Sequence, residues 1–167
     1  MLPLLLALVL AASGCASTQS GPASDATYLV VRHAEKATDD PRDPSLTAAG
    51  RHRAAALATQ LADAPVVAVY GTGFQRTQQT AAPVAARHGL VVRTYDAQQA
   101  ADAFADRLRH AHAHGTVVVV GHSNTVPGIV SALCTCAVAP IDESDYGNRY
   151  TIGFDARGRP TLRHEHD

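Results

Sequence analysis

Two histidines follow two of the most apolar segments of the sequence, each where a run rich in valine ends. His33 comes after Arg32 at the end of residues 28–31, and His122 comes after Gly121 at the end of residues 117–120. Open α/β sheets bind ligands beyond the carboxyl ends of their strands. If both runs are central strands, the two imidazoles lie at the same edge of the sheet, where they are candidates for nucleophilic chemistry.

A further cationic group is predicted at the same edge. Arg76 falls in the first turn of a predicted helix that follows an apolar run at residues 66–70. The free backbone N–H groups of a helix N-terminus favour an anion, and an arginine beside them adds two fork-like donors. Arg76 with Arg32, His33 and His122 would form a concentrated cationic pocket in a chain whose formal net charge is -1. A phosphate group is the natural occupant of such a pocket.

An alternation of strands and helices must position these residues. Short apolar runs predict strands at residues 27–32, 66–70, 90–94, 116–120, 150–154 and 161–164. The segments between these runs predict helices at residues 46–62, 75–88, 97–114 and 124–133, and alanine and leucine dominate the first of them. Thr47 is the predicted N-cap of the first helix, and Gly89 is predicted to end the second. The alternation predicts a single three-layer α/β/α domain with a mainly parallel sheet, from residue 26 to residue 167.

Four segments, in order, resemble motifs of the histidine phosphatase superfamily, which is also called phosphoglycerate mutase-like. Arg-His-Ala-Glu-Lys at residues 32–36 resembles the RHG/RHA motif, and Leu-Thr-Ala-Ala-Gly at 46–50 resembles its LTxxG segment. Residues 74–81 resemble the stretch with the second arginine, and residues 120–123 resemble the segment with the second histidine. The resemblance covers about residues 28 to 130 and implies the phosphoglycerate mutase-like fold.

The resemblance also implies a metal-independent mechanism with no cofactor. His33 would attack phosphorus to form a phosphohistidine, which water would then hydrolyse. Arg32, Arg76 and His122 would hold the phosphoryl oxygens as charge spreads over them. His33 must be neutral to attack, and neighbouring cations would lower its pKa.

The leaving oxygen also needs a proton, and two carboxyl groups are candidates for the donor. The smaller branch of the family uses a glutamate after the strand that follows the second arginine's helix, and Asp96 is the best positional match here. Asp96 with Gln99 also fits a capping box for the next helix. Glu35 is the runner-up because it is two residues from His33, although it can equally pair with Lys36 or an arginine. Ser123 follows His122, which excludes the branch with aspartate at that position.

Three other residues near these motifs have both a functional and a structural interpretation. Ser123 and Asn124 would donate to phosphate from a helix start, or serve there as N-caps. Tyr146 would form a wall of the substrate pocket or pack in the core, and packing is favoured. The loop-like segments 38–45 and 139–148 are where substrate specificity is expected.

The charge pattern and the remaining histidines exclude other classes of ligand. The net charge of -1 provides no basic field for a nucleic acid backbone. His110 and His114 are spaced for one helix face, but cationic compensation at a helix C-terminus explains them without a metal. We therefore expect no metal site.

The first residues predict export and a lipid anchor. Residues 1–12 have the length and composition of a signal-peptide apolar region, and small residues precede Cys15 as in a bacterial lipobox. We expect a signal peptide at residues 1–14, lipidation of Cys15 and a flexible tether over residues 15–25. Ala16 after the cysteine predicts attachment to the outer membrane, facing the periplasm. Cys134 and Cys136 would then lie in an oxidising compartment, either bridged or as packed free thiols.

Three functions are consistent with the sequence. The first is hydrolysis of a small phosphomonoester, because short connections leave little room for the insertions of the family's mutases. The second is a protein phosphohistidine phosphatase, which export disfavours because phosphorelay partners are cytoplasmic. The third is an exported lipoprotein that binds phosphate or a phosphosugar with little or no turnover.

Overall fold

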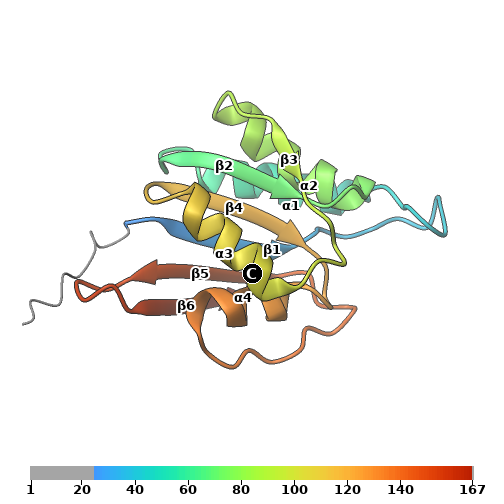
Figure 1. Cartoon of the computed structure of the whole chain (residues 1–167). Coiled ribbons are helices and arrows are strands. Elements are labelled where there is room, and N and C mark those ends of the chain that lie inside the picture. The colour runs from blue at the N-terminus through green and yellow to red at the C-terminus, as the bar shows by residue number, and fades with distance from the viewer. Residues whose placement is uncertain (1–24, 167) are drawn as a thin grey trace, which may run out of the picture.

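The computed structural model describes residues 25–166, which form one six-stranded sheet between two pairs of helices (Figure 1). The strands are β1 (Thr27–Arg32), β2 (Val66–Gly71), β3 (Val92–Thr94), β4 (Thr116–Gly121), β5 (Asn148–Phe154) and β6 (Pro160–His166). The helices are α1 (Ala48–Gln60), α2 (Gln75–Arg87), α3 (Ala101–Ala111) and α4 (Val126–Cys134). The predicted signal peptide, the tether up to residue 24 and Cys15 lie outside the described residues.

The sheet is mainly parallel, as predicted. Its strand order is β3-β2-β4-β1-β5-β6. The first four strands in this order pair in parallel, and β5 and β6 add an antiparallel extension beside β1. The central position of β4 and β1 is the arrangement that brings the residues after them to one edge.

The two faces of the sheet bury different helices. Tyr28 and Val30 of β1 face the cluster that includes residues of α3 and α4, whereas Leu29 and Val31 face residues of α1 and α2. This alternation follows from the two-residue period of a strand. Strands buried on both faces explain why β1 and β4 appear in the sequence as continuous apolar runs.

Three helices begin later than the sequence predicts, the first of them at Ala48 rather than at residue 46. The third predicted helix, 97–114, is shortened at both ends to α3, and its N-cap is Ala100 rather than Asp96. The fourth begins at Val126, after the N-cap Thr125, rather than at Asn124. The predictions at Thr47 and Gly89 are confirmed: the Thr47 side chain accepts from the Gly50 backbone N–H, and Gly89 has a φ of 65° just after α2.

A disulfide joins Cys134 to Cys136 at the end of α4. Cys134 is the last residue of the helix, and Thr135 adopts a left-handed conformation with a φ of 55°. This conformation folds the chain back, so the two Cα atoms are 5.2 Å apart. An extended strand would have pointed the two side chains to opposite faces, but the segment is not a strand. Within residues 25–166, no helix has the length and apolarity needed to span a bilayer.

Candidate active site

The register of β1 and β4 places the two histidines side by side. Arg32 is paired with Gly121 across the two strands, and the backbone N–H of His33 donates to the Gly121 carbonyl at 2.9 Å. The His33 and His122 rings follow directly and lie 5.4 Å apart between centroids, edge to face. Both side chains are buried. The strand ends therefore create the pair of imidazoles that the sequence predicts.

His33 is oriented by the chain that follows it. Its Nδ1 donates to the Ala34 carbonyl at 2.8 Å, which leaves the lone pair on Nε2 when the ring is neutral. Burial lowers the pKa of His33 to about 3; the Ala34 carbonyl opposes this shift, and the charges of Arg32 and Arg76 add to it. The ring is thus neutral at neutral pH, which is the state a nucleophile requires.

His122 is held from the other side by the end of β2. Its Nε2 forms a hydrogen bond with Oγ1 of Thr72 at 3.0 Å, and Thr72 is in turn bonded to Thr77 of α2. Burial, followed by the charges of Arg76 and Arg32, lowers the pKa of His122 to about 4. His122 is therefore a neutral, positioned imidazole rather than a permanent cation.

Arg76 has free hydrogen-bond donors inside the protein. Its side chain is 15% exposed, and its guanidinium lies 4.4 Å from the centre of the Phe74 ring. Nε and Nη1 are buried, and no residue among those described accepts a hydrogen bond from either atom. Asp43 is its nearest carboxylate, 3.8 Å from Nη1. Buried donors of this kind are expected to have a partner, and a phosphoryl oxygen fits their charge.

Arg32 plays a different part from the one predicted. Nη1 donates to the carbonyls of Asp142 and Asp145 at 2.9 and 2.8 Å, and Nη2 donates to the carbonyl of Glu143 at 2.8 Å. Its guanidinium also lies 4.1 Å from the centre of the Tyr146 ring. Only Nε is left without a partner among the described residues. Most of the donors of Arg32 thus hold the loop between α4 and β5, while its charge still acts on both histidines.

The histidines and Arg76 open onto one cavity of about 380 Å³ at the edge of the sheet. The residues that line it follow the ends of β1, β2, β3 and β4 or belong to the loop before β5. They are His33, Lys36, Phe74, Arg76, Ala97, Gln98, His122, Ser123, Asn124, Thr125 and Glu143. Two neutral imidazoles, an arginine with free donors and a lysine make this cavity suited to a small anion with a reactive phosphorus centre.

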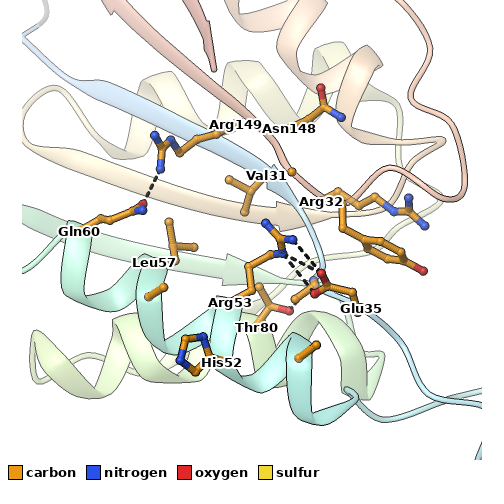
Figure 2. Close-up of a pocket in the computed structure, with 15 residues that line it drawn as sticks. Val31, Arg32, Glu35, His52, Arg53, Leu57, Gln60, Thr80, Asn148 and Arg149 are labelled. Carbon is orange, nitrogen blue, oxygen red and sulfur yellow. Dashed lines mark hydrogen bonds and ion pairs between the residues drawn. The ribbon is translucent and has the colours of Figure 1, made fainter. Parts of the chain in front are cut away.

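Neither predicted proton donor lines this cavity. Glu35 accepts from Nε and Nη2 of Arg53 at 3.0 and 2.8 Å, and this pairing lowers the pKa of its carboxyl (Figure 2). Asp96 is exposed, and its Oδ1 accepts from the Gln98 backbone N–H at 2.9 Å. Asp96 therefore closes a short turn, and the predicted capping box with Gln99 does not form at the start of α3.

The carboxylate that does line the cavity is Glu143, which belongs to none of the motifs found in the sequence. Its Oε1 accepts from Oγ of Ser123 at 2.6 Å. Its Oε2 lies 3.5 Å from Nζ of Lys36 and 3.8 Å from Nη2 of Arg32. The only sequence signal was its place in the segment 139–148, where specificity was expected.

The other predicted site residues lie near the cavity in modified roles. Ser123 and Asn124 both line it, but neither is an N-cap, because Thr125 occupies that position and its Oγ1 accepts from the His122 backbone N–H at 2.9 Å. Tyr146 lies 5.9 Å from His33 between ring centres, yet it lines a different cavity. Its ring packs against the guanidinium of Arg32, 4.1 Å from the ring centre.

That second cavity lies between α1 and β5, on the other side of Arg32 (Figure 2). Its charged groups are compensated within the protein, since Arg53 pairs with Glu35 and Arg149 pairs with Gln60 and Glu165. Among residues 25–166, no three or more His, Cys, Asp or Glu side chains are grouped so that they could hold a metal ion.

Comparisons with known proteins agree with this geometry. Residues 28–99 match the model of the histidine phosphatase superfamily (branch 1). The uncharacterized protein Rv0525 of Mycobacterium tuberculosis is 55% identical over 49 residues, which are 29% of this chain and 24% of that protein. The matched segment thus spans about a quarter of this curated relative.

Solved structures resemble the chain over most of its length. The protein histidine phosphatase SixA complexed with tungstate has a TM-score of 0.66 and 19% identity, covering 84% of this chain and 96% of that chain. The mycobacterial glucosyl-3-phosphoglycerate phosphatase Rv2419c has a TM-score of 0.64 and 14% identity, covering 84% and 97%. At these identities the likeness establishes the fold, which is phosphoglycerate mutase-like.

Proposed function

We propose that this chain belongs to branch 1 of the histidine phosphatase superfamily and hydrolyses a phosphomonoester through a phosphohistidine on His33. One observation carries the proposal: a buried, neutral imidazole shares a cavity with an arginine whose buried Nε and Nη1 have no hydrogen-bond acceptor among residues 25–166. A neutral imidazole is a nucleophile, and the free donors match phosphoryl oxygens.

The reaction would proceed in two steps at one phosphorus atom. Nε2 of His33 forms a bond to phosphorus while the ester oxygen leaves with its bonding electrons and takes up a proton. Water then attacks the phosphohistidine, the P–N bond breaks, and inorganic phosphate leaves with His33 restored. Arg76 and His122 stabilise the charge on the phosphoryl oxygens in both steps, where preorganised donors are most effective.

Trapping of the intermediate tests this proposal. The protein is mixed with a ³²P-labelled aryl phosphate and the reaction is stopped rapidly with alkaline denaturant. The label bound to the protein should be stable in alkali and released by acid. The label should vanish in His33→Ala. A protein that binds phosphate but takes up no label and releases no aryl alcohol would instead be the binding lipoprotein considered above, and the enzyme proposal would fail.

A phosphohistidine protein is a second candidate substrate, favoured by the likeness to SixA, which is described as a protein histidine phosphatase. The Glu143 side chain at the rim of the cavity is 72% exposed, so this rim is open to solvent. Comparison of kcat/KM for a phosphohistidine-bearing domain and for small phosphomonoesters separates the two classes. A preference for the domain would replace the small-molecule assignment.

We also propose that the protein is exported and lipid-anchored through Cys15 on the outer membrane. The apolar run and the small residues before Cys15 support this, and the disulfide between Cys134 and Cys136 is of a kind that persists in oxidising compartments. Metabolic labelling with a radioactive fatty acid tests it. Label should appear on the wild-type protein and be absent from Cys15→Ser.

A further inference from the structure

We infer that Glu143 is the proton donor for the leaving oxygen, in place of Asp96 or Glu35. This inference rests on the proposed phosphatase reaction and names a residue that completes it. Among the described residues that line the cavity containing His33 and His122, Glu143 is the only carboxylic acid.

The contacts of Glu143 hold its carboxylate at the cavity while leaving it in contact with solvent. Ser123, directly after His122, donates to Oε1 at 2.6 Å, and Lys36 lies 3.5 Å from Oε2. The backbone of Glu143 is fixed as well, because its carbonyl accepts from Arg32 at 2.8 Å. The side chain is 72% exposed, so it can exchange a proton with water between turnovers.

The charge state of Glu143 is expected to depend on the substrate. The hydrogen bond from Ser123, then the charges of Lys36 and Arg32, lower the pKa of its carboxyl, so it is ionised when the cavity holds no anion. Other charged or titratable groups that act on it are Arg76 and His122. A phosphate dianion bound among these groups would neutralise their field and repel the carboxylate, and both effects favour protonation. Substrate binding would therefore protonate the Glu143 carboxyl, which can then donate this proton to the leaving oxygen.

The proton then moves through both steps of the reaction. As Nε2 of His33 bonds to phosphorus and the P–O bond breaks, the Glu143 carboxyl gives its proton to the leaving oxygen, which departs as an alcohol. The resulting carboxylate takes a proton from the attacking water as the P–N bond breaks. Phosphate leaves, and Glu143 is protonated again for the next turnover or exchanges with solvent.

The dependence of rate on the leaving group tests this role. An alkyl alkoxide is a poor leaving group without a proton, whereas p-nitrophenolate leaves readily without one. In Glu143→Gln we expect kcat/KM for an alkyl phosphate to fall roughly a hundredfold or more, the range for loss of a general acid. The same variant should lose less than about tenfold in kcat/KM for p-nitrophenyl phosphate, because kcat/KM reports transfer to His33 and not the later hydrolysis of the phosphohistidine. Glutamine keeps an oxygen to accept from Ser123, so the loop should stay folded, and thermal unfolding verifies that.

Two matched variants complete the experiment. Glu165→Gln makes the same change on β6, away from the cavity, and should leave both rates unchanged. Asp96→Asn removes the positional alternative and should also leave the selectivity between the two substrates unchanged. A loss specific to alkyl phosphates in Asp96→Asn rather than Glu143→Gln would overturn the inference.

The remaining outcomes separate this inference from the proposed function. Equal losses in kcat/KM for both substrates in Glu143→Gln, or no loss for either, would mean that Glu143 does not donate the proton, while phosphohistidine formation still stands. If the wild-type protein cleaves p-nitrophenyl phosphate but no alkyl phosphate, Glu143 is likewise not the proton donor and the phosphatase proposal still stands. If the wild-type protein shows neither hydrolysis nor labelling, both the role of Glu143 and the phosphatase proposal are refuted. As a second readout, binding of vanadate to the wild-type protein should take up a proton, measured by calorimetry in buffers of different ionisation enthalpy, and Glu143→Gln should lose this uptake.

Discussion

Replacing Arg76 with lysine separates the geometry of its donors from its charge. Two N–H donors of the guanidinium, Nε and Nη1, are buried and have no hydrogen-bond acceptor among the described residues. A charge-assisted hydrogen bond contributes about 1.5–3 kcal/mol. Lysine keeps the charge but can replace only one of the two bonds, so Arg76→Lys should lose about 2 kcal/mol of transition-state stabilisation. That energy corresponds to a fall of roughly 30-fold in kcat/KM.

Arg76→Ala loses both bonds and the charge, which predicts a loss of about 3–6 kcal/mol, or roughly a hundredfold to ten-thousandfold in kcat/KM. The assay is steady-state hydrolysis of p-nitrophenyl phosphate, with thermal unfolding to verify the fold. Arg87→Lys, at the exposed end of the same helix, is the control and should match the wild type. If Arg76→Lys stays within about threefold of the wild type, the two free donors do not engage the phosphoryl group, and the assignment of the cavity is refuted.

Three further predictions concern stability. Because both buried active-site histidines have lowered pKa values, the unfolded chain takes up protons that the folded chain does not, so stability must fall as the pH falls below the unfolded value of about 6.5. Between about pH 7 and about pH 5, the free energy of unfolding measured in urea should fall by roughly 2 kcal/mol per histidine. His33→Gln should remove about half of this pH dependence. An unchanged pH dependence in that variant would contradict the lowered pKa of His33. Gly50→Ala should destabilise the fold by about 1–3 kcal/mol, because its Cβ would lie 2.4 Å from the Glu35 carbonyl oxygen. Gly73→Ala should not, because no atom beyond its chain neighbours lies within 4 Å of the new Cβ, and equal unfolding midpoints for the two variants would refute the predicted clash. Cys136→Ser should cost only about 1–2 kcal/mol in chemical denaturation because the ring it opens is short, and a collapse of the fold would show that the disulfide does more than close that ring.

The sequence was sufficient to predict the fold and the pairing of His33 with His122. Both predictions depend on local patterns: apolar runs buried on two faces, helices between them, and polar residues directly after the runs. Parallel neighbours then bring residues after two strands together whatever the intervening chain does, and the register of Arg32 with Gly121 completes the geometry.

The sequence did not predict Glu143 as the proton donor, because its position does not depend on a local sequence pattern. Glu143 comes to the cavity on a loop, and its place is set by hydrogen bonds to Arg32 and Ser123 that no short-range pattern reveals. Asp96 matched a position in a family motif, but the start of α3 is four residues later than expected, and Asp96 instead turns the chain at the surface. Loop geometry of this kind depends on tertiary contacts rather than on sequence spacing.

The bonds from Arg32 to the loop before β5 have a consequence for how the protein can diversify. All three acceptors are backbone carbonyls, at Asp142, Glu143 and Asp145, and every amino acid supplies a carbonyl. Side chains along this loop can therefore be exchanged without releasing its anchor. Arg32, beside the nucleophile, thus fixes the backbone of this loop. Substitutions in the loop can change the contacts to substrate without displacing His33.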